Sequence, residues 1–232
     1  MNRHRLSWLP TIVIALFLAS CGGEKKQAEE SQAAGVEAET EVPTPKTIDE
    51  AIARGNIEAV KSFIAADPNA ASSGARPGSP PLHQAILRQK SDIALLLITS
   101  GADVNAVDSS RRTPLHLCVE RDLADLVAPL TEAGAKPDEK DPAGWTPLHH
   151  TGAKDRVAVA KALLENGADV NIRSELGGTP LHEAAASASA ELVKILLDAG
   201  VDASIVADGG SALDIAKEFE NEAAIKLLSE AK

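Results

Sequence analysis

The tetrapeptide Thr-Pro-Leu-His begins at Thr113, Thr146 and Thr179, so each copy follows the previous one after 33 residues. A partial copy, Pro-Pro-Leu-His, begins at Pro80, again 33 residues earlier. A second, glycine-led motif of the type Gly-Ala-Asp-Val-Asn keeps the same step, with copies starting at Gly101, Gly134, Gly167 and Gly200. Two motifs on one period predict a stack of similar units, each burying its apolar face against the next.

Each copy of the tetrapeptide has the residues that begin a helix. Threonine is a favoured N-cap, and proline is tolerated at the first helical position because the amide hydrogen it lacks would have no partner there. Histidine takes the position where a capping box carries Glu or Gln, so its side chain can bond back to the threonine. The glycine of the second motif suits the left-handed residue that follows a helix. Each unit is therefore expected to hold two short helices.

These two motifs resemble those of the ankyrin-repeat family, and the resemblance extends from Thr47 to the end of the chain. It implies an all-α repeat solenoid in which antiparallel helix pairs carry β-hairpin fingers. Aligned on the period, the chain holds about six units, and the first and last depart from the motif as terminal caps do. The expected bounds are 47–74, 75–107, 108–140, 141–173, 174–207 and 208–232. The first helix is expected to begin with the capping-box pattern Thr47–Glu50.

The histidines recur because the helix cap recurs, at His83, His116, His149 and His182. Stacked helices lie about 8–10 Å apart, whereas zinc–nitrogen bonds are about 2 Å long. Successive cap histidines are therefore not expected to share a metal, and the sequence predicts no metal site. It contains no phosphate-binding glycine loop, metalloprotease motif or nucleophile elbow, so we expect neither enzymatic activity nor a cofactor.

Three positions depart from the repeat pattern. Pro80 replaces a capping threonine, which Ser79 could replace in part. Pro129 falls within an expected second helix, where it would cost about 3 kcal/mol or kink the helix. Gly152 falls within an expected first helix, which it should weaken. The middle of the stack is therefore expected to be locally loose, either by tolerated drift or as a bend that fits a partner.

The N-terminus has the pattern of a targeting segment. Residues 1–20 combine a basic start with a short apolar stretch, which is typical of a signal peptide. Leu18–Cys21 resembles the lipobox of bacterial lipoproteins, which implies a fatty-acylated (palmitate-bearing) Cys21; an ordinary signal peptide with a chance cysteine is the alternative. Gly22 follows where inner-membrane lipoproteins often carry aspartate, which favours the outer membrane facing the periplasm.

Residues 21–46 are acidic and poor in large apolar side chains, as expected of a flexible tether before a repeat domain at 47–232.

Charge and composition exclude one class of partner. The net charge is −11 and aromatic residues make up only 2% of the chain. Nucleic-acid binding needs basic grooves and stacking rings, so we expect none.

The family resemblance implies that partners contact the residue before each tetrapeptide, the end of the first helix, and the position after the histidine. Trp145 and its basic neighbours predict a surface for an acidic patch on a partner protein, since Trp and Arg dominate binding hot spots. Packing of Trp145 on the neighbouring finger is the alternative. The predicted contact residues are Arg111, Arg112, Leu117, Arg121, Trp145, His150, Lys154 and Glu183.

The leading functional hypothesis is a monomeric, lipid-anchored interaction module of the bacterial cell envelope. A redox or metal-handling protein that uses Cys118 and the histidines is one alternative, although Cys118 is better explained by packing. An effector presented on the cell surface is another.

Overall fold

The computed structural model describes residues 44–74 and 78–231, which belong to one compact unit. The expected signal peptide, Cys21 and most of the expected tether lie outside the described residues. No helix in the described part of the chain is both long enough and apolar enough to cross a bilayer.

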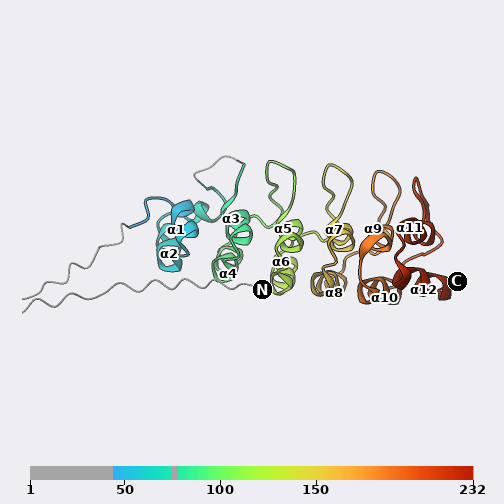
Figure 1. Ribbon diagram of the computed structural model, residues 1–232. Helices are drawn as coiled ribbons and strands as arrows, with labels where there is room; N and C mark the ends of the chain where they lie inside the picture. Colours follow the sequence, from blue (N-terminus) through green and yellow to red (C-terminus); the bar gives the residue numbers. More distant parts are fainter. Residues whose placement is uncertain (1–43, 75–77, 232) are drawn as a thin grey trace, which may run out of the picture. The chain divides into compact units, whose positions relative to one another are not determined.

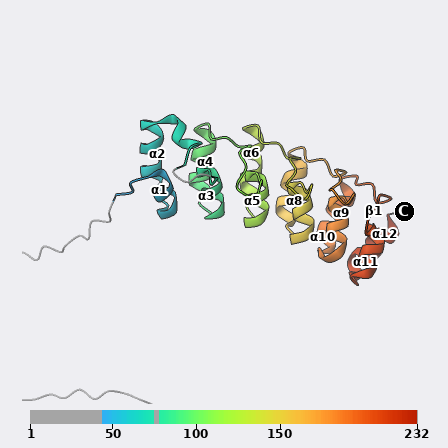
Figure 2. The same cartoon turned by 90° about the horizontal axis from the view of Figure 1, so that it is seen from above.

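The predicted stack of helix pairs is confirmed (Figure 1). The pairs are α1 (Ile48–Arg54) with α2 (Ile57–Ala66), α3 (Pro81–Leu87) with α4 (Ser91–Thr99), α5 (Pro114–Arg121) with α6 (Val127–Glu132), α7 (Pro147–Lys154) with α8 (Val157–Glu165), α9 (Pro180–Ser187) with α10 (Ala190–Asp198), and α11 (Ala212–Glu218) with α12 (Glu222–Glu230). Two 3-10 helices, η1 (Pro68–Ala71) and η2 (Ala124–Leu126), accompany them. First helices pack on first helices and second helices on second helices, so the pairs follow one another in chain order (Figure 2).

The core is a continuous layer of aliphatic side chains that follows the 33-residue period. The leucine of each tetrapeptide is buried, at Leu82, Leu115, Leu148 and Leu181. Each following second helix buries another leucine at a fixed place, at Leu97, Leu130, Leu163 and Leu196. Because both series lie between neighbouring pairs, each unit depends on the next to keep its apolar face out of water.

The capping role predicted for threonine and histidine is confirmed in the three complete motifs. The backbone amides of Thr113, Thr146 and Thr179 donate to Nδ1 of the histidine three residues later, at 3.1–3.2 Å. In the last unit, Ser211 and Asp214 form the same reciprocal box with a carboxylate.

The cap differs from expectation in the first two units. Thr47 Oγ1 accepts the Glu50 amide hydrogen, but the Glu50 carboxylate accepts from Lys46 and Arg54 instead of returning to Thr47. In the second unit Pro80 is the N-cap and makes no side-chain cap bond. His83 Nδ1 has no hydrogen-bond partner, so Ser79 does not take over the threonine's bond to the histidine.

The loops between successive pairs, here called fingers, project to the same side of the helices (Figure 1). Within the described residues, strands form only in the last finger, where β1 (Val206–Ala207) pairs antiparallel with β2 (Gly210–Ser211). In the fingers before α5, α7 and α9 the predicted β-hairpins are reduced to tight turns closed by a backbone bond, such as Asp141 N–H to Trp145 O at 2.9 Å.

The second helix that contains Pro129 is rebuilt at its start. It begins as η2 and becomes α-helical only at Val127, which places Pro129 in the first turn of α6. The first amides of a helix have no intrahelical acceptor, so proline loses no bond there. The expected mid-helix kink is therefore wrong: the helix starts later instead.

Gly152, the other expected weak point, does not interrupt its helix. Helix α7 runs unbroken past it, and Gly152 is buried against α9. A β-carbon at this position would lie 2.6 Å from the carbonyl oxygen of Pro180, so glycine permits a close approach of the two helices.

Candidate functional site

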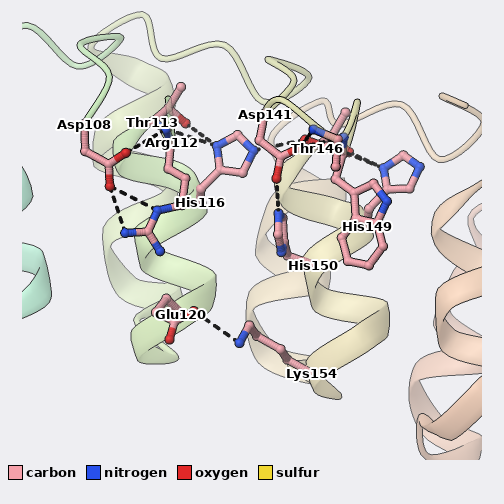
Figure 3. A network of polar contacts seen from close by, with 12 residues as sticks. Asp108, Arg112, Thr113, His116, Glu120, Asp141, Thr146, His149, His150 and Lys154 are labelled. Carbon is pink, nitrogen blue, oxygen red and sulfur yellow. Dashed lines mark hydrogen bonds and ion pairs between the residues drawn. The ribbon is translucent and has the colours of Figure 1, made fainter. Parts of the chain in front are cut away.

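Polar side chains gather where the finger before α7 meets helices α5 and α7 (Figure 3). His150 Nε2 lies 2.8 Å from Asp141 Oδ2, and the two side chains are 21% and 10% exposed. The other carboxylate oxygen, Asp141 Oδ1, accepts the amide hydrogens of Ala143 and Trp145 at 2.9 and 3.0 Å. The turn of the finger therefore fixes the carboxylate and leaves Oδ2 to His150.

His116 reaches the same place from the preceding unit. Its Nδ1 accepts the Thr113 amide hydrogen, so Nε2 carries the proton and donates to Trp145 O, 3.1 Å away. Its ring meets the ring of His150 edge to face, with centroids 5.5 Å apart. One ligand atom from each of His116, Asp141 and His150 lies within 4.8 Å of the other two.

The indole of Trp145 is half-buried. It stacks on His149 with centroids 6.3 Å apart and meets His150 edge to face at 5.0 Å. These ring contacts are with helix α7 and not with the neighbouring finger that the alternative named, and the exposed part of the indole remains available to a partner.

Two of the four basic residues in the predicted contact surface form ion pairs within the chain. Arg112 donates through Nε and Nη2 to Asp108 Oδ2, at 3.0 and 2.8 Å. Lys154 Nζ lies 3.1 Å from a Glu120 carboxylate oxygen on the neighbouring first helix. Two further predicted contact residues, Arg111 and Arg121, are exposed and form no ion pair with any described residue.

Leu117 is fully buried, so its side chain is out of reach of a partner, contrary to the prediction. It shares its repeat position with His150 and Glu183, but it packs into the core. Glu183 is half-buried without an ion pair to a described residue, and burial raises the pKa of its carboxyl group.

Cys118 is also fully buried between helices, and burial strongly raises the pKa of its thiol. The reactive form of cysteine is the thiolate, which this environment disfavours. The structure thus favours the packing role and disfavours a redox role for Cys118.

One set of surface residues was missed in the sequence. A single finger position, repeated every 33 residues, holds Val107, Lys140, Arg173 and Val206, and all four are exposed. We call this set the finger row. Its two basic residues lie between two apolar ones, and Lys140 Nζ donates to Arg173 O at 2.8 Å, which links adjacent fingers. Reading the finger positions on the same period as the helices would have revealed it.

Comparison with known proteins agrees with the geometry. A family model described as ankyrin repeats, in three copies, matches residues 48–141 and 154–232. No curated protein matches the chain. Repeats of this family typically bind other proteins. With its stacked helix pairs, capped first helices and projecting fingers, the chain belongs to the ankyrin-repeat family.

Proposed function

We propose that the chain is a protein-binding module held at the bacterial outer membrane, facing the periplasm, by a lipid on Cys21. It binds a partner protein that presents an acidic patch and performs no chemistry of its own. The family supports the binding role; the lipobox pattern Leu18–Cys21 supports the anchor.

The finger row carries this proposal. Val107 and Val206 are 44% and 65% exposed, and burial of such side chains against a partner is favourable. The side chains of these two valines take no part in the hydrogen bonds between fingers, which run through backbone groups, through Asp and Asn side chains and through Lys140. Lys140 and Arg173 add positive charge between them on a chain with net charge −11. An apolar row with a basic centre fits a partner surface that carries acidic residues beside apolar ones.

The exposed residues Arg111 and Arg121 extend the positive charge toward the ends of the fingers and first helices. They remain predicted contacts, together with Trp145 and His150. Arg112 and Lys154 are secondary because a partner would have to compete with Asp108 and Glu120 for them.

A crosslinked pull-down from membranes tests the binding surface. The double variant Lys140→Glu/Arg173→Glu reverses the charge of the finger row. Its matched control, Lys161→Glu/Lys194→Glu, makes the same charge change on second helices α8 and α10, away from the fingers. We expect a specific protein that the wild-type chain and the control capture and that the finger variant loses. Equal capture by both variants would refute this surface.

The anchor is tested separately. Labelled palmitate should be incorporated into the wild-type chain and not into Cys21→Ser, which should move from the outer-membrane fraction to the soluble one. Protease added to intact cells should leave the wild-type chain uncut, because the outer membrane protects it. Cleavage would instead support the surface-exposed effector.

A further inference from the structure

We propose that His116, Asp141 and His150 form a binding site for one divalent transition-metal ion of the zinc class. The three residues come from two neighbouring units and one finger, and Figure 3 shows their side chains turned toward the same place. Imidazole nitrogen and carboxylate oxygen are ordinary ligands of Zn²⁺. Three protein ligands with an open fourth position describe a site that can also take water or a group from a partner.

Hydrogen bonds from its own finger orient the Asp141 carboxylate for metal binding. Both amide hydrogens that it receives go to Oδ1, so the carboxylate is oriented while Oδ2 faces His150. Hydrogen bonds to the non-ligating atoms of a ligand residue are the usual second layer of a metal site. Asp141 therefore needs no rearrangement to offer Oδ2 to an ion.

The distance between Asp141 and His150 requires only a small adjustment, whereas the ligand atom of His116, within 4.8 Å of theirs, would have to come closer. Ligand atoms around tetrahedral zinc lie about 3.3 Å apart, given bonds of about 2 Å. Asp141 Oδ2 and His150 Nε2 are now 2.8 Å apart and would separate slightly to admit the ion. To ligate through Nε2, His150 would carry its ring hydrogen on Nδ1, and the ion would take the place of the hydrogen between Nε2 and Asp141 Oδ2.

His116 makes the larger change. To ligate through Nε2, it gives up its bond to Trp145 O, and its proton moves to Nδ1. That nitrogen lies 2.8 Å from Thr113 Oγ1, to which it can then donate a hydrogen bond, but it no longer accepts the Thr113 amide hydrogen. Ion binding therefore replaces one bond of the helix cap by another and is coupled to the contact between two units.

Among the described residues, this combination occurs at one interface between units. One unit earlier, the position of Asp141 holds Asp108, which is already paired with Arg112. The position of His150 holds Leu117 there, which has no ligand atom. One unit later they hold Ser174 and Glu183. The preceding unit thus has the aspartate but no second histidine, and the following unit has neither Asp141 nor His150, so the site does not follow from the repeat itself.

The test uses the full chain, purified in detergent without an affinity tag, with Co²⁺ and Zn²⁺ as probes. Co²⁺ should produce visible d–d absorption bands that saturate at one ion per chain, and one equivalent of Zn²⁺ should abolish them. His150→Gln and Asp141→Asn should each weaken metal binding at least tenfold. Loss of a residue that only hydrogen-bonds to a metal ligand already lowers metal affinity by about that factor.

Matched controls separate ligation from capping. Asp108→Asn changes the equivalent carboxylate of the neighbouring finger, and His182→Gln changes an equivalent cap histidine; both should bind the ion as the wild type does. Circular dichroism shows that each variant is folded. A third variant, His116→Gln, removes the remaining ligand. If it fails to fold, His150→Gln and Asp141→Asn still test the metal site, because both residues are partly exposed and their replacement should leave the fold intact. Absence of saturable bands, or unchanged affinity in these two variants, would overturn the proposal.

Discussion

Gly152 and Pro180 bring two first helices into backbone contact. A β-carbon at Gly152 would lie 2.6 Å from the carbonyl oxygen of Pro180 and 2.9 Å from the backbone nitrogen of Ala184. Backbone atoms have little freedom to move aside, since helix α9 is itself held by its cap and core. The packing of α7 against α9 therefore requires a residue without a side chain at position 152.

Gly152→Ala should therefore destabilise the protein, although alanine is the better helix former by about 1 kcal/mol. Overpacking typically costs about 1–3 kcal/mol, and this clash involves backbone, so a net loss of about 2 kcal/mol is expected. Urea unfolding provides the measurement. Ala153→Gly, at an exposed position of the same helix, measures the effect of helix propensity on stability without any change in packing. A Gly152→Ala protein more stable than the wild type would contradict the close approach.

These positions also show what the sequence can and cannot predict. Helix starts at Thr113, Thr146 and Thr179 were predictable because a cap depends on four consecutive residues. The role of Gly152 was not, because its reason lies in Pro180 and Ala184 of the next unit. The same holds for Leu117, whose burial depends on its neighbours in space.

The candidate site, too, was predictable from the sequence only in part. The sequence supplied Trp145 and His150 as candidate site residues. It missed that His116 meets His150, since that contact joins a cap position of one unit to a different position of the next.

Pro80→Thr should stabilise the protein. His83 is buried and its Nδ1 has no hydrogen-bond partner, because Pro80 supplies neither an amide hydrogen nor a hydroxyl group. An unsatisfied buried polar group costs about 1–3 kcal/mol. Threonine would supply both partners, as Thr113 does for His116, against a loss of about 0.4–1 kcal/mol from the greater freedom of the unfolded chain.

A net gain of about 1 kcal/mol in the free energy of unfolding is expected for Pro80→Thr, measured by urea titration. Pro80→Val has nearly the shape of threonine and restores the amide hydrogen alone, so it should gain less. Equal or lower stability of Pro80→Thr than of the wild type would show that His83 does not need the cap.

Asp138→Asn should also stabilise the protein. At the equivalent finger position, Asn105 accepts from the Lys136 amide and donates to Gly134 O, at 3.0 and 2.9 Å. Asp138 accepts from the Asp169 amide, but a carboxylate has no hydrogen to donate. Burial, together with the charge of Asp169, raises the pKa of the Asp138 carboxyl group, so its ionised form is disfavoured in the fold.

The sign of the pH effect follows from the raised pKa. Ionised Asp138 weakens the fold above that pKa, and the loss disappears as the pH falls through it. The gain from Asp138→Asn, about 1 kcal/mol at neutral pH, should therefore shrink in acid. The reverse change at the equivalent position, Asn171→Asp, should destabilise. An Asp138→Asn protein with unchanged unfolding midpoint at pH 7 would refute this reading.

Cys118 should react with a thiol reagent only when the protein unfolds. It is fully buried, and the raised thiol pKa disfavours the thiolate. In the Cys21→Ser variant, Cys118 is the one remaining cysteine, so labelling reports it alone. Slow labelling in buffer that becomes rapid in concentrated urea is expected. Rapid labelling of the folded protein at neutral pH would revive the redox hypothesis.

Acid should destabilise the stack through its cap histidines. Burial lowers the pKa of His116 and of His149 from 6.5 to about 4, because a charged ring would lose its water. The unfolded histidines bind protons below about pH 6.5 while the folded ones do not, so stability is fully present above pH 6.5 and falls toward pH 4. One unit of pKa shift corresponds to about 1.4 kcal/mol, which gives roughly 3 kcal/mol for each of these histidines.

His149→Gln separates this effect from that of the carboxylates. Glutamine can accept the Thr146 amide hydrogen from the same helical position, but it does not titrate. The variant should be less stable at pH 7, because the bond from His149 Nε2 to Gly178 O is lost, and its stability should fall less steeply between pH 6.5 and 4. Urea midpoints across this range provide the measurement. Parallel curves for the variant and the wild type would mean that His149 is protonated in the folded protein, and a charged His149 could not accept the Thr146 amide hydrogen on Nδ1.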